Sequence, residues 1–125
     1  MKRVLIADDE PIERMIVTRT IQKYFPEELA VVSAVNGREA VEQFFAENCQ
    51  IALLDIEMPG MNGLEAAEQI RERDKNCSII FLTAFDEFNY AKRAIAVRAM
   101  EYLLKPVEDQ DCLLYTSPSP RDSTS

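Results

Sequence analysis

Hydrophobic residues along the chain fall into short apolar runs that alternate with longer segments of mixed polarity. The short runs contain few polar residues, which is typical of strands buried on both faces of a parallel sheet. Most of them end at a charged or turn-forming residue, so each strand has a clear carboxyl end. We expect five strands, at Val4–Ala7, Leu29–Val35, Ile51–Asp55, Ser78–Thr83 and Glu101–Leu104.

The segments between these runs have the spacing of amphipathic helices. Pro11 suits the first turn of a helix, where its missing N–H costs nothing. The apolar face expected for this first helix consists of Ile12, Ile16, Ile21 and Phe25.

Three further helices are expected, each after a residue that can cap a helix. Asn36 and Asn62 are each followed three residues later by a glutamate, which is the pattern of a capping box, and Asp86 can cap the fourth helix. The expected inner faces are Ala40, Val41, Phe44 and Phe45 in the second helix, Leu64, Ala67 and Ile70 in the third, and Ala91, Ala94 and Ile95 in the fourth.

Strict alternation of strands and helices with short connections predicts one α/β domain, a parallel sheet wound with helices on both faces. We expect residues 1–111 to form this domain. A fifth helix could begin in Val107–Leu114, but Pro118 and Pro120 prevent it from continuing, so it is expected to be truncated. Residues 112–125 are rich in Ser, Thr and Pro and are interpreted as a linker or as foreign sequence joined to the domain.

The composition excludes several classes of function. The 125 residues carry a net charge of −8, which disfavours nucleic-acid binding by this domain because such binding depends on clustered Lys and Arg. Three cysteines lie far apart and histidine is absent, which excludes a Cys/His zinc site and a histidine-dependent triad. An odd cysteine count, no signal peptide and no apolar run of about 20 residues together favour a soluble cytoplasmic protein with no membrane span.

Polar residues follow four of the expected strands: Asp8 and Asp9, then Asp55, Thr83 and Lys105. In open α/β sheets the ligand site lies at this carboxyl edge. Three carboxylates there repel one another, so the group must bind a cation or take up protons. Mg²⁺ is the cation that suits such oxygen ligands, and Asp55 could then act as a nucleophile towards a phosphoryl group.

Each of these residues also has an ordinary explanation when it is taken alone. Asp9 could cap the following helix, and Asp55 could belong to a simple turn before Pro59. Lys105 could be a solvated surface lysine, and Thr83 suits a strand through its branched Cβ. Their coincidence at matching strand ends favours a shared site.

Four separated motifs have the order and spacing of one known family: Ala7–Pro11, Leu54–Gly63, Leu82–Ala84 and Tyr102–Pro106. On these motifs the chain resembles the receiver domain of a two-component response regulator, over roughly residues 2–111. The resemblance implies a flavodoxin-like, CheY-like sheet of five strands in the order 2-1-3-4-5.

The resemblance also implies roles for individual residues. Asp55 would accept a phosphoryl group from a phosphohistidine of a sensor histidine kinase, in a Mg²⁺-dependent reaction. Asp9, Asp55 and the backbone carbonyl of Glu57 would bind Mg²⁺ directly, and Asp8 would act through water. These assignments make the acidic residues both the phosphoacceptor and the metal site.

A second group of implied roles concerns the response to phosphorylation. Thr83 and Lys105 would contact the phosphoryl group, and the switch would couple Thr83 to an inward turn of Tyr102. Arg98 stands where these receivers often have glycine, so we expect either a strained turn or a longer fourth helix there.

The partners implied by the resemblance are a sensor histidine kinase and a second copy of the chain. A phosphorylation-dependent homodimer would use the fourth helix, fifth strand and fifth helix, a surface that the truncated fifth helix reduces. Phe85–Ile95 and Tyr102–Val107 are similar to receivers that precede an AraC-type helix-turn-helix output domain, which implies control of transcription.

Two alternatives to a phosphorylation switch are open. Asp55 and Glu57 have the spacing of the two acids of an aspartate-nucleophile phosphohydrolase, for which multiple turnover would be the sign. A degenerate receiver that serves only as a scaffold would fail to bind Mg²⁺. The resemblance implies self-phosphorylation and slow dephosphorylation rather than turnover, with Glu57 and Phe85 near enough to tune the dephosphorylation rate.

Overall fold

The computed structural model describes residues 1–84 and 88–105. In this part of the chain five parallel strands form one sheet in the order β2-β1-β3-β4-β5. The predicted α/β fold with its flavodoxin-like strand order is therefore confirmed. The strands are β1 (Lys2–Ala7), β2 (Leu29–Ala34), β3 (Ile51–Asp55), β4 (Ser78–Thr83) and β5 (Glu101–Leu104).

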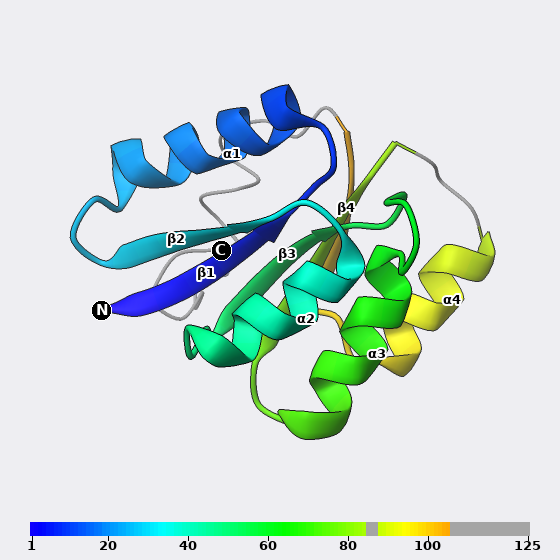
Figure 1. Ribbon diagram of the computed structural model, residues 1–125. Helices are drawn as coiled ribbons and strands as arrows, with labels where there is room; N and C mark the ends of the chain where they lie inside the picture. The colour runs from blue at the N-terminus through cyan, green and yellow to red at the C-terminus, as the bar shows by residue number, and fades with distance from the viewer. Residues whose placement is uncertain (85–87, 106–125) are drawn as a thin grey trace, which may run out of the picture.

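Within the described part of the chain, four helices cover the two faces of this sheet. Figure 1 shows α1 on one face and α2, α3 and α4 together on the other. Along residues 1–84 and 88–105, no helix has both the length and the apolar character that a membrane crossing requires. The predicted fifth helix, the cap at Asp86 and the domain boundary at residue 111 all lie outside the described residues. The helices are α1 (Pro11–Tyr24), α2 (Gly37–Ala46), α3 (Gly63–Arg73) and α4 (Phe88–Ala96).

The core is divided into two layers by the alternation of side chains along the strands. On β1, Val4 and Ile6 point to the side covered by α1, whereas Leu5 and Ala7 point to the side covered by α2, α3 and α4. All five residues of β3 are buried, as expected for the central strand of a sheet covered on both faces. This central position places the end of β3, Asp55, inside the fold.

The predicted inner face of α1 is partly wrong. Ile12 and Ile16 are 66% and 48% exposed, and the buried residues of the helix are Val17, Thr20 and Ile21. At about 100° per residue, the nine positions from Ile12 to Ile21 bring these two side chains to opposite faces. The four isoleucine and phenylalanine positions therefore do not form one stripe, and the outer face of α1 keeps exposed apolar side chains.

The inner face of α4 also needs one correction. Ala94 is buried as expected, but Ile95 is 76% exposed. The two residues are adjacent and lie about 100° apart around the helix, so burying one turns the other towards solvent. The expected inner faces of α2 and α3 agree with the structure, in which Phe44 and Ile70 are among the largest fully buried side chains.

Both predicted asparagine caps are present. The Asn36 side chain accepts a hydrogen bond from the backbone N–H of Glu39 at 2.8 Å, although the Glu39 carboxylate bonds to the N–H of Val35 rather than to that of Asn36. At α3 the capping box is complete, because Asn62 and Glu65 each accept a hydrogen bond from the other's backbone N–H.

The chain leaves α4 through a left-handed turn at Arg98, where φ is +57°. The helix ends at Ala96, so the turn is strained rather than the helix extended. A buried arginine, Arg71 of α3, donates hydrogen bonds to the carbonyls of Val97 at 2.8 Å and Arg98 at 3.3 Å. It also bonds to the carbonyl of Cys77 at 2.8 Å, and thus fixes the end of α4 against the start of β4.

We expect Arg71→Met to lower the free energy of unfolding by about 2–4 kcal/mol, because the two buried hydrogen bonds to the carbonyls of Val97 and Cys77 would be lost. Urea unfolding of the variant and of the parent chain measures this difference. The matched control is Arg38→Met, which removes an arginine that is 81% exposed and paired with Glu42 across one helical turn. That change should cost less than about 0.5 kcal/mol, and equal losses in both variants would refute the structural role of Arg71.

Candidate functional site

The acidic residues predicted from the strand ends lie together. Asp8 and Asp9 follow β1, Asp55 ends β3, and β1 and β3 are neighbouring parallel strands. One carboxylate oxygen from each of the three residues lies within 4.8 Å of the others. Asp8 and Asp55 are each only 3% exposed, whereas Asp9 is exposed. The sheet therefore brings two buried acids and one exposed acid to a single point.

Lys105 reaches the same point from the end of β5. Its ammonium nitrogen lies 2.9 Å from Asp8 Oδ2, 3.4 Å from Asp55 Oδ2 and 3.5 Å from Glu10 Oε1. The lysine side chain is only 12% exposed. Its backbone N–H donates to the carbonyl of Thr83 at 2.7 Å, which holds residue 105 beside the end of β4.

The negative charge of this cluster exceeds what one lysine can balance. The pKa of Asp55 is raised to about 7, first by burial and then by the charge of Asp8, while Lys105 and the N–H of Glu57 oppose this shift only in part. Burial alone would lower the pKa of Lys105, but its hydrogen bond to Asp8 and the charges of Asp55 and Asp8 raise it instead. The cluster thus holds a firmly protonated ammonium and a carboxyl group that gives up its proton reluctantly.

Backbone contacts fix the direction of each buried carboxylate. Asp8 Oδ1 accepts a hydrogen bond from the N–H of Glu10 at 2.9 Å, and Arg14 donates to the carbonyl of Asp8 at 2.6 Å. Asp55 Oδ1 accepts from the N–H of Glu57 at 3.3 Å. Both oxygens of Asp55 are therefore contacted, one by a backbone amide and the other by Lys105.

A glycine allows α3 to begin directly against the site. A Cβ on Gly63 would lie 2.1 Å from the carbonyl oxygen of Asp55, far inside contact distance. The N–H of Gly63 donates to the carbonyl of Ile56 at 3.0 Å, which closes the loop after β3. The glycine therefore sets the path of the chain immediately after Asp55.

The two residues expected to act as a switch lie on one face of the sheet. Phe81 pairs with Tyr102 across β4 and β5, and Thr83 is two residues after Phe81, so Thr83 and Tyr102 point to the same side. Thr83 is fully buried. Tyr102 is half-buried and packs against the core on the side of α2, α3 and α4.

Three residues around the cluster were missed from the sequence. Glu10 is the third carboxylate beside Lys105, and Arg14 holds the backbone of Asp8. Tyr90 of α4 donates a hydrogen bond to the Glu57 carboxylate. The acidic run before Pro11 could have suggested Glu10, but no local pattern links residues 57 and 90.

Comparison with known proteins decides the family. The sequence model of the response regulator receiver domain matches residues 4–116. The chain belongs to the response regulator receiver family. Receiver domains bind Mg²⁺ at an acidic pocket and are phosphorylated by sensor histidine kinases, and they act as signal transducers.

Individual relatives agree with this assignment. The chain is 42% identical to a positive alginate biosynthesis regulatory protein of Pseudomonas aeruginosa, over 86% of this chain and 43% of that protein. The receiver domain of AraT, a response regulator from Geobacillus stearothermophilus, is 38% identical, with a TM-score of 0.78 over 89% of this chain and 86% of that one. The chain thus spans less than half the length of the alginate regulator.

A third relative was solved with ligands. The chain resembles the structure of a CheX–CheY–BeF3–Mg²⁺ complex from Borrelia burgdorferi at 29% identity and a TM-score of 0.76, over 92% of this chain and 86% of that one. In the present receiver domain, the group formed by Asp8, Asp9 and Asp55 consists of carboxylates alone. Such oxygen donors suit a hard divalent cation, so the residues present fit Mg²⁺.

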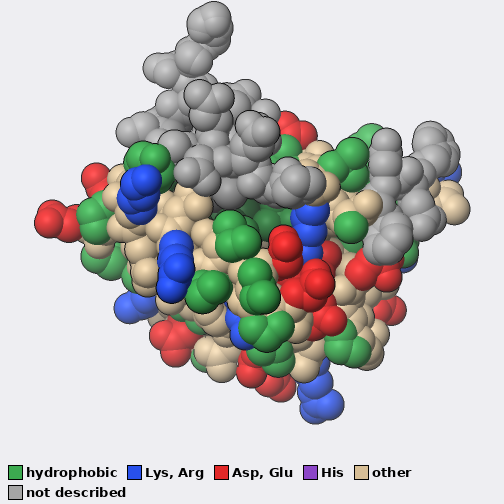
Figure 2. Space-filling model, turned by 90° about the horizontal axis from the view of Figure 1, so that it is seen from above, with side chains coloured by type: hydrophobic (Ala, Val, Ile, Leu, Met, Phe, Trp, Pro, Cys, Tyr) green, Lys and Arg blue, Asp and Glu red, His purple; other side chains and the backbone are tan. Residues whose placement is uncertain are grey.

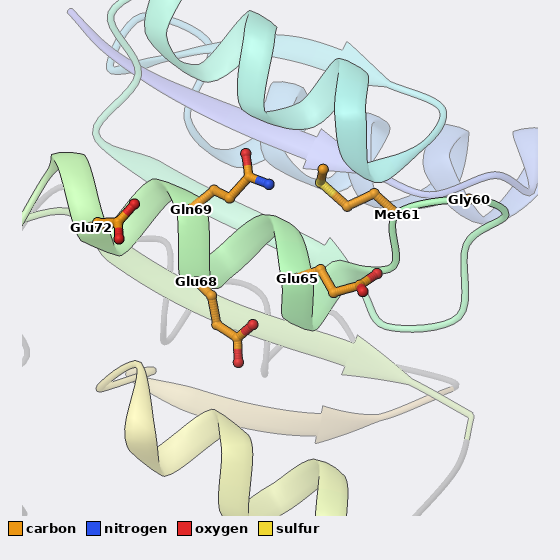
Figure 3. Close-up of a pocket in the computed structure, with 6 residues that line it drawn as sticks. All are labelled: Gly60, Met61, Glu65, Glu68, Gln69 and Glu72. Carbon is orange, nitrogen blue, oxygen red and sulfur yellow. The ribbon is translucent and has the colours of Figure 1, made fainter.

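A separate hollow of about 560 Å³ lies along α3, away from the predicted site residues. In Figure 3, Met61 and Gln69 point towards α2, whereas Glu68 points towards α4. Glu68 pairs there with Arg93 of α4 at 3.2 Å. The hollow is open and mostly polar. Its lining residues are Gly60, Met61, Glu65, Glu68, Gln69 and Glu72.

The pKa of Asp55 predicts how stability depends on pH. The folded value of about 7 exceeds the free value of 3.8, so folding favours protonated Asp55 and this contribution is lost as pH rises from about 4 through 7. Asp55→Asn cannot ionise. In the presence of a chelator we expect it to be more stable than the parent by roughly 2–4 kcal/mol at pH 8, with the difference shrinking towards pH 4.

Urea unfolding at a series of pH values measures this effect. Glu72→Gln is the matched control, because it removes an exposed acid on α3 and should leave the pH dependence unchanged. If the free energy of unfolding of Asp55→Asn exceeds that of the parent by the same amount from pH 4 to pH 8, the raised pKa of the buried Asp55 carboxyl is contradicted.

Proposed function

We propose that this receiver domain accepts a phosphoryl group on Asp55 from a sensor histidine kinase and thereby controls an output such as transcription. The observation that carries the proposal is the placement of Asp55. Its carboxylate lies 3.4 Å from the Lys105 ammonium and beside the carboxylates of Asp8 and Asp9, at the carboxyl edge of the sheet.

The reaction is a transfer between two nucleophiles. One Asp55 oxygen attacks the phosphorus atom of the donor phosphohistidine, the new P–O bond forms as the P–N bond breaks, and the imidazole nitrogen keeps the bonding electron pair. Lys105 is the cation placed to pair with the phosphoryl oxygens, and the Thr83 hydroxyl is the proposed hydrogen-bond donor to them. The contribution of the protein is therefore orientation and charge stabilisation.

The metal ligands follow the family pattern. Asp9, Asp55 and the backbone carbonyl of Glu57 would hold Mg²⁺ directly, and Asp8 would hold it through water. When bound, the ion supplies positive charge that offsets the crowded carboxylates and the phosphoryl oxygens. The raised pKa of Asp55 supports this assignment, because a bound cation favours the ionised, nucleophilic carboxylate.

The expected response to phosphorylation is a shift in population between two conformational states of the domain, driven by the new charge on Asp55. Thr83 and Tyr102 form the proposed switch pair, and their position on one face of the sheet supports it. A phosphorylation-dependent homodimer through α4, β5 and the predicted fifth helix stays a prediction. Exposed Ile95, Met100 and Leu104 on this surface support it. An AraC-type output domain also stays a prediction.

The central test is intact mass after incubation with acetyl phosphate. We expect the chain to gain one phosphoryl group with Mg²⁺ present and none with a chelator, while Asp55→Asn gains none in either condition. Glu72→Gln, which removes an acid outside the site, should gain as much as the parent. Lys105→Met should gain at least about tenfold more slowly, since it removes the cation that faces the transferred group.

Other outcomes would favour the alternatives. Continuous release of phosphate from many small phosphate esters would indicate a phosphohydrolase. A folded chain that neither binds Mg²⁺ nor gains a phosphoryl group would indicate a scaffold. Either result would refute the phosphorylation switch.

The outer face of α1 supports a protein as the phosphoryl donor. Ile12, Met15 and Ile16 lie on one side of this helix and are 66%, 42% and 48% exposed. Figure 2, which looks down on the face bearing α1, shows hydrophobic side chains gathered beside acidic ones. An apolar patch of this kind next to a reactive group is typical of a docking surface.

We expect Ile16→Asp to slow phosphoryl transfer from a histidine kinase by at least about tenfold, because a charge would be placed in the apolar contact. The kinase is one chosen from a panel for its transfer to the parent chain. The rate at which Ile16→Asp gains a phosphoryl group from acetyl phosphate should equal that of the parent. The control Ile95→Asp changes an equally apolar, 76% exposed residue on α4, and equal slowing in both variants would argue against docking on α1.

A further inference from the structure

Glu57 is a carboxylate that the structure keeps apart from the acidic cluster, although it lies two residues after Asp55. Among the described residues, the carboxylates of Asp8, Asp55 and Glu10 approach the Lys105 ammonium. The Glu57 carboxylate accepts a hydrogen bond from the hydroxyl of Tyr90 on α4 instead. The Glu57 carboxylate is thus held beside α4.

The same residue is tied to the phosphoacceptor through its backbone. The N–H of Glu57 donates to Asp55 Oδ1 at 3.3 Å. Tyr90 is half-buried and packs against the core on the side of α2, α3 and α4, so the position of its ring is set by the fold. Glu57 therefore links Asp55 to α4, because its backbone N–H contacts Asp55 and its carboxylate contacts Tyr90 of α4.

We propose that Tyr90 is a positioning residue for the phosphoryl chemistry at Asp55. Its hydroxyl holds the Glu57 carboxylate against α4 and away from the carboxylate of Asp55. This inference rests on the proposed function. Phosphoryl donors are anions, and a free carboxylate so near Asp55 would repel them. Glu57 is exposed, so salt in the solvent would screen this repulsion.

The structure offers a matched control on the same helix. Arg93 lies three residues after Tyr90 and pairs with Glu68 of α3 at 3.2 Å. Both side chains are partly exposed, and the pair is a second polar contact that holds α4. Removing it loosens α4 without releasing a charge beside Asp55, which separates the two possible effects of Tyr90.

The experiment measures the rate of phosphoryl gain from acetyl phosphate by intact mass, with Mg²⁺, at low and high salt. We expect Tyr90→Phe to slow the gain about three- to tenfold at low salt and much less at high salt. Arg93→Gln should stay within about twofold of the parent. In a Glu57→Gln background, Tyr90→Phe should have no further effect, because the released side chain carries no charge.

If Tyr90→Phe does slow the gain, the inference would still be overturned by equal slowing in Arg93→Gln, by slowing that does not depend on salt, or by the same slowing in the Glu57→Gln background. Each would make Tyr90 a structural contact of α4 only. Urea unfolding of every variant shows that the compared chains are folded. A parent chain that gains no phosphoryl group would refute the proposed function, and this inference with it, whereas a reactive parent with an unaffected Tyr90→Phe would refute the inference alone.

Discussion

The structure of the site depends on the crowding of carboxylates around Lys105. Asp8 and Asp55 are buried at the ends of neighbouring strands and share one ammonium group. Removing charges from water is costly unless they are balanced, and the pKa of Asp55, raised to about 7, shows that the balance is incomplete. A site with excess buried negative charge favours the binding of a cation.

The fold makes this crowding possible through close backbone approach. A Cβ on Gly63 would lie 2.1 Å from the Asp55 carbonyl oxygen, and one on Gly37 would lie 2.2 Å from that of Met61. These glycines let the first turns of α3 and α2 lie directly on the loop that follows Asp55. Larger residues would move that loop, and with it the backbone N–H of Glu57 that contacts the Asp55 carboxylate.

The strands and the acidic site were predictable from the sequence because buried parallel strands appear as continuous apolar runs and their ends meet at one edge. The inner face of α1 was not, because isoleucines occur on both of its sides and spacing alone does not show which side is buried. The contacts of Arg71 with Val97 and of Tyr90 with Glu57 join residues far apart in sequence. Only the packing of α3 and α4 against the sheet brings such pairs together.

Helix α4 is held differently at its two ends. Near its C-terminus, the Arg71 guanidinium bonds to the carbonyls of Val97 and Arg98 and to that of Cys77 before β4. The contacts with Val97 and Cys77 are buried and that with Arg98 is partly buried, and all three are made to backbone carbonyls rather than to a carboxylate. Near its N-terminus, Tyr90 bonds to Glu57, whose N–H contacts Asp55. One end of α4 is therefore tied to the framework around β4, and the other end is tied through Glu57 to Asp55 in the acidic cluster.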